Sequence, residues 1–271
     1  MAWFRMMGRD SVEYHERTVL ARDDDFEAGA LTYYGSRGET PLAWGGGLAA
    51  RLGLAGPVDS DAYRSVFGPG GARDPHLRTR LAETSRPGVE LVVAAHKSVA
   101  VLGLVGRAED MHAMLDAETG ATLAFLEVWF QRQGGRRGRA RTRTPTSGLL
   151  WARTRHATSR AGDPAPHDHI LIANVTEMLD ARGGWKALDT GGLRDLVHAA
   201  TMAGRVASAS VAVELGYAIE ADAGPSGSLD HWRIAGVPGT VTEVFSKRSA
   251  EIDAAMAAEG FTSPRARGVG A

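Results

Sequence analysis

Three histidines, His156, His167 and His169, lie within fourteen residues of one another and restrict how the surrounding chain can fold. The flanking segments, residues 149–155 and 170–175, are rich in apolar residues and predict two strands. Residues i and i+2 of a strand face the same side, so one strand can present His167 and His169 to a single point. If the two strands pair, His156 completes a three-histidine face. The alternative is three unrelated surface histidines, because an isolated His-x-His also occurs by chance.

Other segments predict the elements around these strands. Residues 88–104 (GVELVVAAHKSVAVLGL) fit a buried strand at 90–95, a turn, and a helix from about Ser98. The strongest helical periodicity runs over Ala108–Phe130. Further helices are expected at residues 48–54, 193–215 and 246–259, a loop packed by Trp44 precedes the first of them, and a hairpin is expected across residues 224–227.

The composition admits a large core and limits the chemistry. The chain has 271 residues, of which 44% are hydrophobic, and a formal net charge of -1. Affinity for a polyanion must therefore come from local basic clusters. Cysteine is absent, which excludes disulfides, zinc-thiolate sites and thiol nucleophiles, so a metal must be held by His, Asp or Glu. The N-terminus has no apolar block long enough for a signal peptide or a membrane span, and we expect a cytoplasmic protein that does not contact a membrane.

A three-histidine metal centre leaves the reaction open. The ion could activate water, as in a hydrolase, or it could polarise a phosphodiester and leave the attack to a side chain. Tyr14, Tyr33 and Tyr34 are three of the five tyrosines, and all lie in polar surroundings within the first 34 residues. Tyr14 lacks the apolar neighbours that usually accompany a structural tyrosine, which makes it a candidate nucleophile.

Three runs of the chain are together specific enough to suggest a family. Residues 156–174 read HATSRAGDPAPHDHILIAN, residues 90–102 read ELVVAAHKSVAVL, and a Tyr and a Tyr-Tyr pair precede WGGGLAARLGLAG. In content and order they resemble the histidine metal motif, the Asp…Pro-Lys-Ser-Val motif and the tyrosine opening of conjugative relaxases of the TrwC/TraI type, the MobF class. The resemblance covers residues 1 to about 259.

The resemblance implies a two-layer α/β fold, in which an antiparallel sheet of about five strands carries the histidines and helices pack on one face, as in HUH endonucleases. It implies a relaxase, an enzyme that nicks one DNA strand at a specific site and transfers that strand. His156, His167 and His169 would hold a divalent metal ion, Mg²⁺ or Mn²⁺, against the scissile phosphate.

The resemblance also implies catalytic roles outside the histidines. Tyr14 would attack phosphorus and form a 5′-phosphotyrosine, and Tyr33 or Tyr34 would serve a second transfer. The interval between Tyr14 and the pair is longer than in known members, so Tyr33 stays an alternative first nucleophile. Glu90 occupies the position of an aspartate that orients a metal histidine and helps to deprotonate the tyrosine.

Basic residues beside the motifs are expected to contact DNA. The predicted DNA-binding residues are Lys97, Ser98, Arg153, Arg155 and Arg160. Residues 131–143 carry six arginines and three glycines and are expected to form a mobile loop or hairpin tip that follows DNA phosphates.

Two departures from the family pattern leave alternatives to a conjugative relaxase. Glu90 replaces an aspartate and His96 replaces the proline before Lys97, so a catalytically inactive DNA-binding remnant is one alternative. A rolling-circle replication initiator, which shares the histidine pair and the tyrosine attack, is another. The sequence does not identify the DNA site that is recognised, because base readout depends on side-chain geometry in the grooves or on a folded hairpin.

The expected partners are single-stranded DNA at a transfer origin and accessory conjugation proteins. Residues 1–271 are expected to form a single relaxase domain with a flexible tail from about residue 260. No Walker-type GxxxxGK[ST] run is found, so no helicase domain is expected within this sequence.

Overall fold

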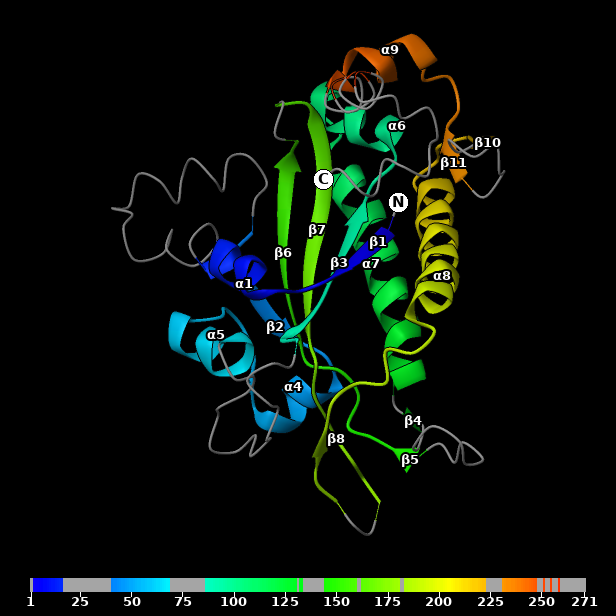
Figure 1. The fold of residues 1–271 in the computed structure, drawn as a ribbon. Coiled ribbons are helices and arrows are strands. Elements are labelled where there is room, and N and C mark those ends of the chain that lie inside the picture. Colours follow the sequence, from blue (N-terminus) through cyan, green and yellow to red (C-terminus); the bar gives the residue numbers. More distant parts are fainter. Residues whose placement is uncertain are drawn as a thin grey trace.

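A five-stranded antiparallel sheet forms the centre of the fold (Figure 1). The computed structural model describes residues 2–16, 40–68, 86–130, 132–133, 144–159, 162–180, 183–222 and 231–247, with residues 251, 254 and 258. In spatial order the strands are β1 (Ala2–Met6), β3 (Gly88–Ala94), β7 (Pro164–Ala173), β6 (Trp151–Thr158) and β2 (Ala43–Gly45). All neighbouring pairs are antiparallel, so the predicted sheet is confirmed.

Two long helices cover one face of the sheet, α7 (Ala108–Phe130) and α8 (Leu193–Glu214) (Figure 1). Leu126 of α7, Val197 of α8 and Ile170 of β7 belong to one buried cluster. The bounds of α7 coincide with the predicted ones. By length and composition α8 could cross a membrane, with a hydropathy of 1.3 over its most apolar window, but 44% of that window is buried in the fold. Packing accounts for the apolar side chains at the start of α8, from Leu193 to Ala200, whereas Val206 and Val213 are exposed.

The opposite face of the sheet also carries three short helices, although the resemblance implied helices on one face, and the helix Gly47–Leu52 is the one predicted at residues 48–54. They are α1 (Arg9–His15), α4 (Gly47–Leu52) and α5 (Ser60–Phe67). Val12, Tyr63 and Leu171 share a second buried cluster on this face. The Tyr63 hydroxyl donates to the carbonyl of Val12 at 3.2 Å, which ties α1 to α5. Because α1 carries Tyr14, the predicted nucleophile belongs to a helix on this face.

The segment around Trp44 is a strand rather than a surface loop. Trp44 lies in β2 and is buried, and its ring stacks on Phe67 at a centroid distance of 6.3 Å. Gly46, with φ of 98°, turns the chain directly from β2 into α4. The loop interpretation failed because the partner of Trp44 lies on α5, a helix that the periodicity had not indicated.

Short elements complete the fold. They are α6 (Lys97–Ala100), the 3-10 helix η2 (Val101–Val105), β4 (Arg132–Gln133), β5 (Thr144–Pro145), β8 (Thr176–Glu177), β9 (Trp185–Lys186), β10 (Ile219–Asp222), β11 (His231–Ile234) and α9 (Gly239–Val244). The predicted late hairpin is confirmed as β10–β11. The strands β4 and β5 pair across the arginine-rich segment, most of which lies outside the described residues.

A short helix that the sequence did not predict, α9, precedes the last predicted helix, and Pro238 is its N-cap, with φ of -63°. Within the expected range 246–259, the described residues 247, 251, 254 and 258 are all helical. Most of that expected range, and the tail from about residue 260, lie outside the described residues.

Candidate metal centre

The structure brings the three predicted histidines together on the sheet face that also carries α1. His156 of β6 pairs in register with His167 of β7, and His169 follows two residues later on the same face. Their ring centroids are 4.9 to 5.4 Å apart. One ligand atom from each ring lies within 4.8 Å of the other two. The cluster arises from strand alternation and strand pairing, as the spacing predicts.

The protonation of two rings suits a metal. His167 Nδ1 lies 2.6 Å from the carbonyl oxygen of Ala165, and His169 Nδ1 lies 2.6 Å from Glu90 Oε1. An Nδ1–H that donates to each acceptor leaves Nε2 with its lone pair. The two Nε2 atoms face each other at 3.1 Å. That separation fits two ligands of one ion, each about 2.0 to 2.1 Å from the metal.

Burial keeps the His167 imidazole ready to bind a cation. Burial lowers the pKa of His167 below the usual histidine value, and this effect outweighs the hydrogen bond to Ala165, which acts in the opposite direction. The neutral form is the one that can ligate. With His156 and His169 as the other nitrogen donors, the residues fit a divalent ion with open positions for oxygen ligands.

Glu90 is a buried carboxylate shared by three elements. Only 1% of it is exposed, and it contacts Arg5 of β1, His15 of α1 and His169 of β7. Burial alone would raise the pKa of Glu90, but the contacts with His15 and His169 outweigh burial and hold that pKa well below the usual range. The geometry therefore supports the predicted orienting role. The predicted role of Glu90 as a base toward the tyrosine stays a prediction.

The predicted nucleophile lies beside this cluster. Tyr14 is 37% exposed on α1, and its ring is 5.4 Å from the ring of His15. The His15 ring is in turn 5.9 Å from that of His169. Two ring contacts thus join Tyr14 to a metal-site histidine. Tyr33 and Tyr34 lie outside the described residues.

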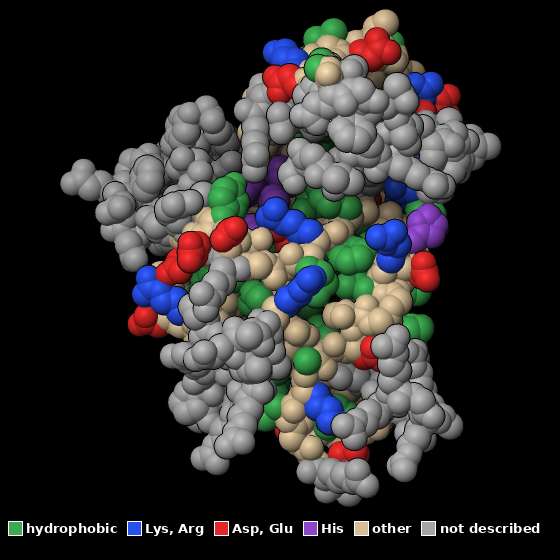
Figure 2. Space-filling model, viewed as in Figure 1, with side chains coloured by type: hydrophobic (Ala, Val, Ile, Leu, Met, Phe, Trp, Pro, Cys, Tyr) green, Lys and Arg blue, Asp and Glu red, His purple; other side chains and the backbone are tan. Residues whose placement is uncertain are grey.

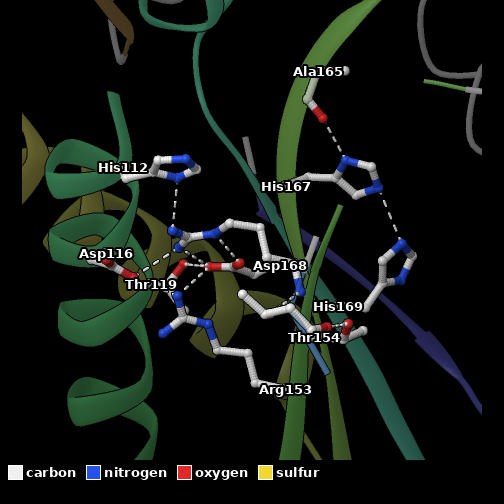
Figure 3. A network of polar contacts seen from close by, with 11 residues as sticks. His112, Asp116, Thr119, Arg153, Thr154, Ala165, His167, Asp168 and His169 are labelled. Atoms are coloured by element: carbon white, nitrogen blue, oxygen red, sulfur yellow. Dashed lines mark hydrogen bonds and ion pairs between the residues drawn. The ribbon is translucent and has the colours of Figure 1, made fainter. Parts of the chain in front are cut away.

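Arg153 and Arg155 do not join the histidines. Figure 3 shows His167 and His169 on one side of β7 and Asp168 on the other, facing α7. Arg155 binds Asp168 through Nε and Nη2, at 2.8 and 2.9 Å, and also binds Asp116 at 2.8 Å. Arg153 contacts the same two carboxylates. The expected DNA contacts of both arginines are therefore corrected: along β6 they alternate with His156 and point to the helical face.

The other predicted DNA contacts have different outcomes. Ser98 is fully buried and its hydroxyl accepts from the Ile234 amide, so its predicted contact with DNA is corrected. Lys97 donates to the carbonyl of Pro164 at 2.9 Å, close to the histidine strand. Arg160 lies outside the described residues.

His96, which departs from the family pattern, has a structural role. Its Nδ1 accepts from the Ser98 amide at 3.1 Å, so it caps α6. Its Nε2 lies 3.0 Å from Asp222 of β10. The substitution therefore gives α6 a side-chain link to the β10–β11 hairpin that a proline cannot make.

The structure adds three residues that the sequence reasoning missed. His15 and Arg5 contact Glu90, and Trp3 is 48% exposed on β1. Trp3 pairs with Val92, which pairs with His169, so all three lie in one row across the sheet. Alternation along β1 could have placed Trp3 and Arg5 on one face, but the segment was not identified as a strand.

Loss of one imidazole is expected to remove metal binding. In wild-type protein, metal at about 100 times its Kd should stabilise the fold by about 2.7 kcal/mol. His167→Ala should lose this stabilisation and metal-dependent DNA cleavage while keeping most DNA binding, because two imidazoles bind an ion far less tightly than three. Thermal unfolding with and without metal measures the effect. His198→Ala, at an exposed position of α8, is the matched control. An unchanged metal response in His167→Ala would contradict the assignment.

The fold and the histidine face together define a class. An antiparallel sheet that presents one histidine and a His-x-His pair on one face is the arrangement of HUH-type proteins. Within that class, the chain belongs to the TrwC relaxase family, whose profile matches residues 8–270.

Two named relatives support this assignment. The chain is 31% identical over 250 residues to the multifunctional conjugation protein TraI of Escherichia coli, a match that covers 86% of this chain and 13% of TraI. The same values hold for TraI of strain K12. The chain therefore spans a small part of the length of these curated relatives.

Solved structures of TrwC have the same fold. The metal-bound complex of conjugative relaxase TrwC with oriT DNA superposes with a TM-score of 0.73 and is 25% identical, with 98% of this chain and 88% of that chain covered. A copper-bound complex with oriT DNA gives a TM-score of 0.74 at 25% identity, with 99% and 90% covered.

Proposed function

We propose that this chain nicks one DNA strand at a transfer origin, remains covalently attached to it, and transfers it during conjugation. The observation that carries the proposal is the cluster of three imidazoles, with ligand atoms within 4.8 Å, on the sheet face to which α1 brings Tyr14. The DNA complexes of TrwC, including a metal-bound one, support it.

The proposed reaction is a transesterification. The Tyr14 oxygen forms a bond to phosphorus as the bond to the 3′-oxygen breaks, which leaves a 5′-phosphotyrosine, and the tyrosine proton balances the released 3′-hydroxyl. A bound divalent ion, Mg²⁺ or Mn²⁺, supplies charge stabilisation on the phosphate oxygens. His156, His167 and His169 hold it. Glu90 orients His169, and Tyr33 or Tyr34 attacks in a second transfer.

Single-stranded DNA is expected to cross the face that carries the histidines, where histidine and basic side chains lie close together (Figure 2). Lys97, beside Pro164 of β7, is a proposed DNA contact. Arg160, which lies outside the described residues, is another. The proposal also includes accessory conjugation proteins as partners and a cytoplasmic location for the protein. Neither bears on the chemistry of the site.

Trp3 is expected to stack on a base of the bound strand, because its exposed ring lies in the same row of the sheet as His169. Stacking on an aromatic ring is worth about 1 to 3 kcal/mol per base. Trp3→Ala should therefore weaken single-stranded DNA binding by roughly 5- to 150-fold. Fluorescence anisotropy with a labelled oligonucleotide measures the affinity. Trp129→Ala, which removes a ring 40% exposed on α7, should leave it unchanged; equal losses in the two variants would contradict the expectation.

Covalent capture tests the proposed function. The protein is incubated with single-stranded oligonucleotides that span candidate transfer origins and with Mg²⁺ or Mn²⁺, and a denaturing gel detects a protein–DNA adduct. An adduct that a chelator prevents is the expected result. Tight DNA binding without any adduct would identify a DNA-binding remnant instead. Cleavage that yields free ends and no adduct would indicate attack by water.

A further inference from the structure

His15 is a buried histidine outside the metal triad. Only 2% of it is exposed, at the last turn of α1. Its ring contacts that of Tyr14, the adjacent residue, and that of His169 across the face of the sheet. His15 therefore lies between the proposed nucleophile and a proposed metal ligand.

The surroundings of His15 are costly for a residue whose only task is packing. Its Nε2 approaches Glu90 Oε1 to 3.2 Å, yet neither ring nitrogen forms a well-aligned hydrogen bond within the described part of the chain. An unsatisfied buried polar group costs about 1 to 3 kcal/mol. An apolar side chain of similar size would fill the same space without that cost. The approach to Glu90 is thus the one polar interaction that the described residues offer to the imidazole.

Glu90 connects His15 to the metal centre. The oxygen that His15 approaches, Oε1, is the one that holds His169 Nδ1 at 2.6 Å. The other oxygen, Oε2, is held by Arg5 from β1. His15, Glu90 and His169 could also be considered as ligands of a second ion. The Arg5 guanidinium already places a positive charge on this carboxylate and disfavours that use.

We propose that His15 is a positioning residue: it holds α1 to the carboxylate that orients His169, and so sets where the Tyr14 hydroxyl stands relative to the metal-bound phosphate. This inference rests on the proposed function. A shift of α1 by one ångström would move the attacking oxygen by a similar amount. Misplacement of that size can cost a reaction about 100-fold in rate.

Two substitutions separate positioning from packing. His15→Gln places an amide nitrogen near the location of Nε2 and can still donate to Glu90. His15→Leu fills a similar volume but cannot donate. At saturating single-stranded DNA and metal, the rate constant for adduct formation should fall by roughly 10- to 100-fold in His15→Leu and should be largely retained in His15→Gln. The Kd values for DNA and metal should stay near wild type in both, and neither variant should unfold at a lower temperature than wild type.

A double-mutant cycle shows whether the effect passes through Glu90. If it does, His15→Leu should add little to the loss that Glu90→Gln causes alone, because both changes break the same link. Wild-type adduct formation with an unaffected His15→Leu variant would overturn the inference and leave the proposed function intact. The inference would also be overturned if metal affinity in His15→Leu fell by as much as the rate constant. The same holds if His15→Gln lost as much of the rate constant as His15→Leu. Absence of any adduct with the wild-type protein would overturn both.

Discussion

Tyr14→Phe is expected to reduce formation of the covalent protein–DNA adduct by a factor on the order of 10³ or more, because the substitution removes the oxygen that attacks phosphorus in the proposed reaction. Metal and DNA affinity should remain near wild type. The substitution leaves α1 in place, since α1 is held by the buried side chain of Val12 and by the Tyr63 hydroxyl. The measurement is the rate of adduct formation on a denaturing gel with single-stranded DNA and Mn²⁺.

Two further tyrosine variants make the Tyr14 result specific. Tyr217→Phe removes a hydroxyl that donates to Asp110 at 2.5 Å, on α7, and should leave the adduct unchanged. A combined Tyr33→Phe and Tyr34→Phe variant should keep the first cleavage and lose the second strand transfer. Adduct at the wild-type rate in Tyr14→Phe, with the DNA mapped to a peptide that contains Tyr33 or Tyr34, would move the nucleophile to that pair.

Local periodicity predicted much of the fold, and long-range pairing limited the rest. The apolar repeat of α7 and the apolar run of β3 each lie within one segment, so their bounds could be predicted closely. The strand β1 has five residues of alternating burial at the sheet edge, and its partner β3 begins more than 80 residues later. So short a strand gives little signal until its partner is known.

The site residues also divide into those that a local pattern predicts and those whose contacts depend on long-range packing. His167 and His169 are two residues apart on one strand, so their common face could be predicted from alternation alone. The same rule applied to Arg155 and His156, which are adjacent, would have placed them on opposite faces. The contact between His15 and Glu90 could not be predicted, because it depends on how α1 packs against a strand far along the chain.

The second large effect is expected at Asp168, on the face of β7 opposite the histidines. Asp168 lies between His167 and His169 in sequence, is fully buried, and accepts from Arg155, from Arg153 and from the Thr119 hydroxyl (Figure 3). Asp168→Asn keeps the shape of the side chain but leaves the buried Arg155 guanidinium without its main countercharge. Breaking a buried ion pair in this way costs about 3 to 5 kcal/mol. The free energy of unfolding should fall by that amount, measured by urea denaturation with chelator present.

Asp116 provides the matched control for this loss. It binds the same two arginines, with its closest contacts at 2.5 and 2.8 Å, but 55% of its side chain is exposed. Water screens such a pair, so Asp116→Asn should cost at most about 1 kcal/mol. Similar losses in the two variants would mean that the distance to the arginines, and not burial, decides the energy.

A paired replacement separates the charge of Asp168 from its place on the strand. If the loss in Asp168→Asn comes from the uncompensated guanidinium, then Asp168→Leu combined with Arg155→Met should recover most of the stability, because well-packed apolar residues can replace a buried ion pair at little cost. Metal binding should stay near wild type in the paired variant, since His167 and His169 point away from the substituted pair. Recovered stability with weakened metal binding would instead mean that the ion pair sets the orientation of the two histidines, a role that apolar packing cannot supply.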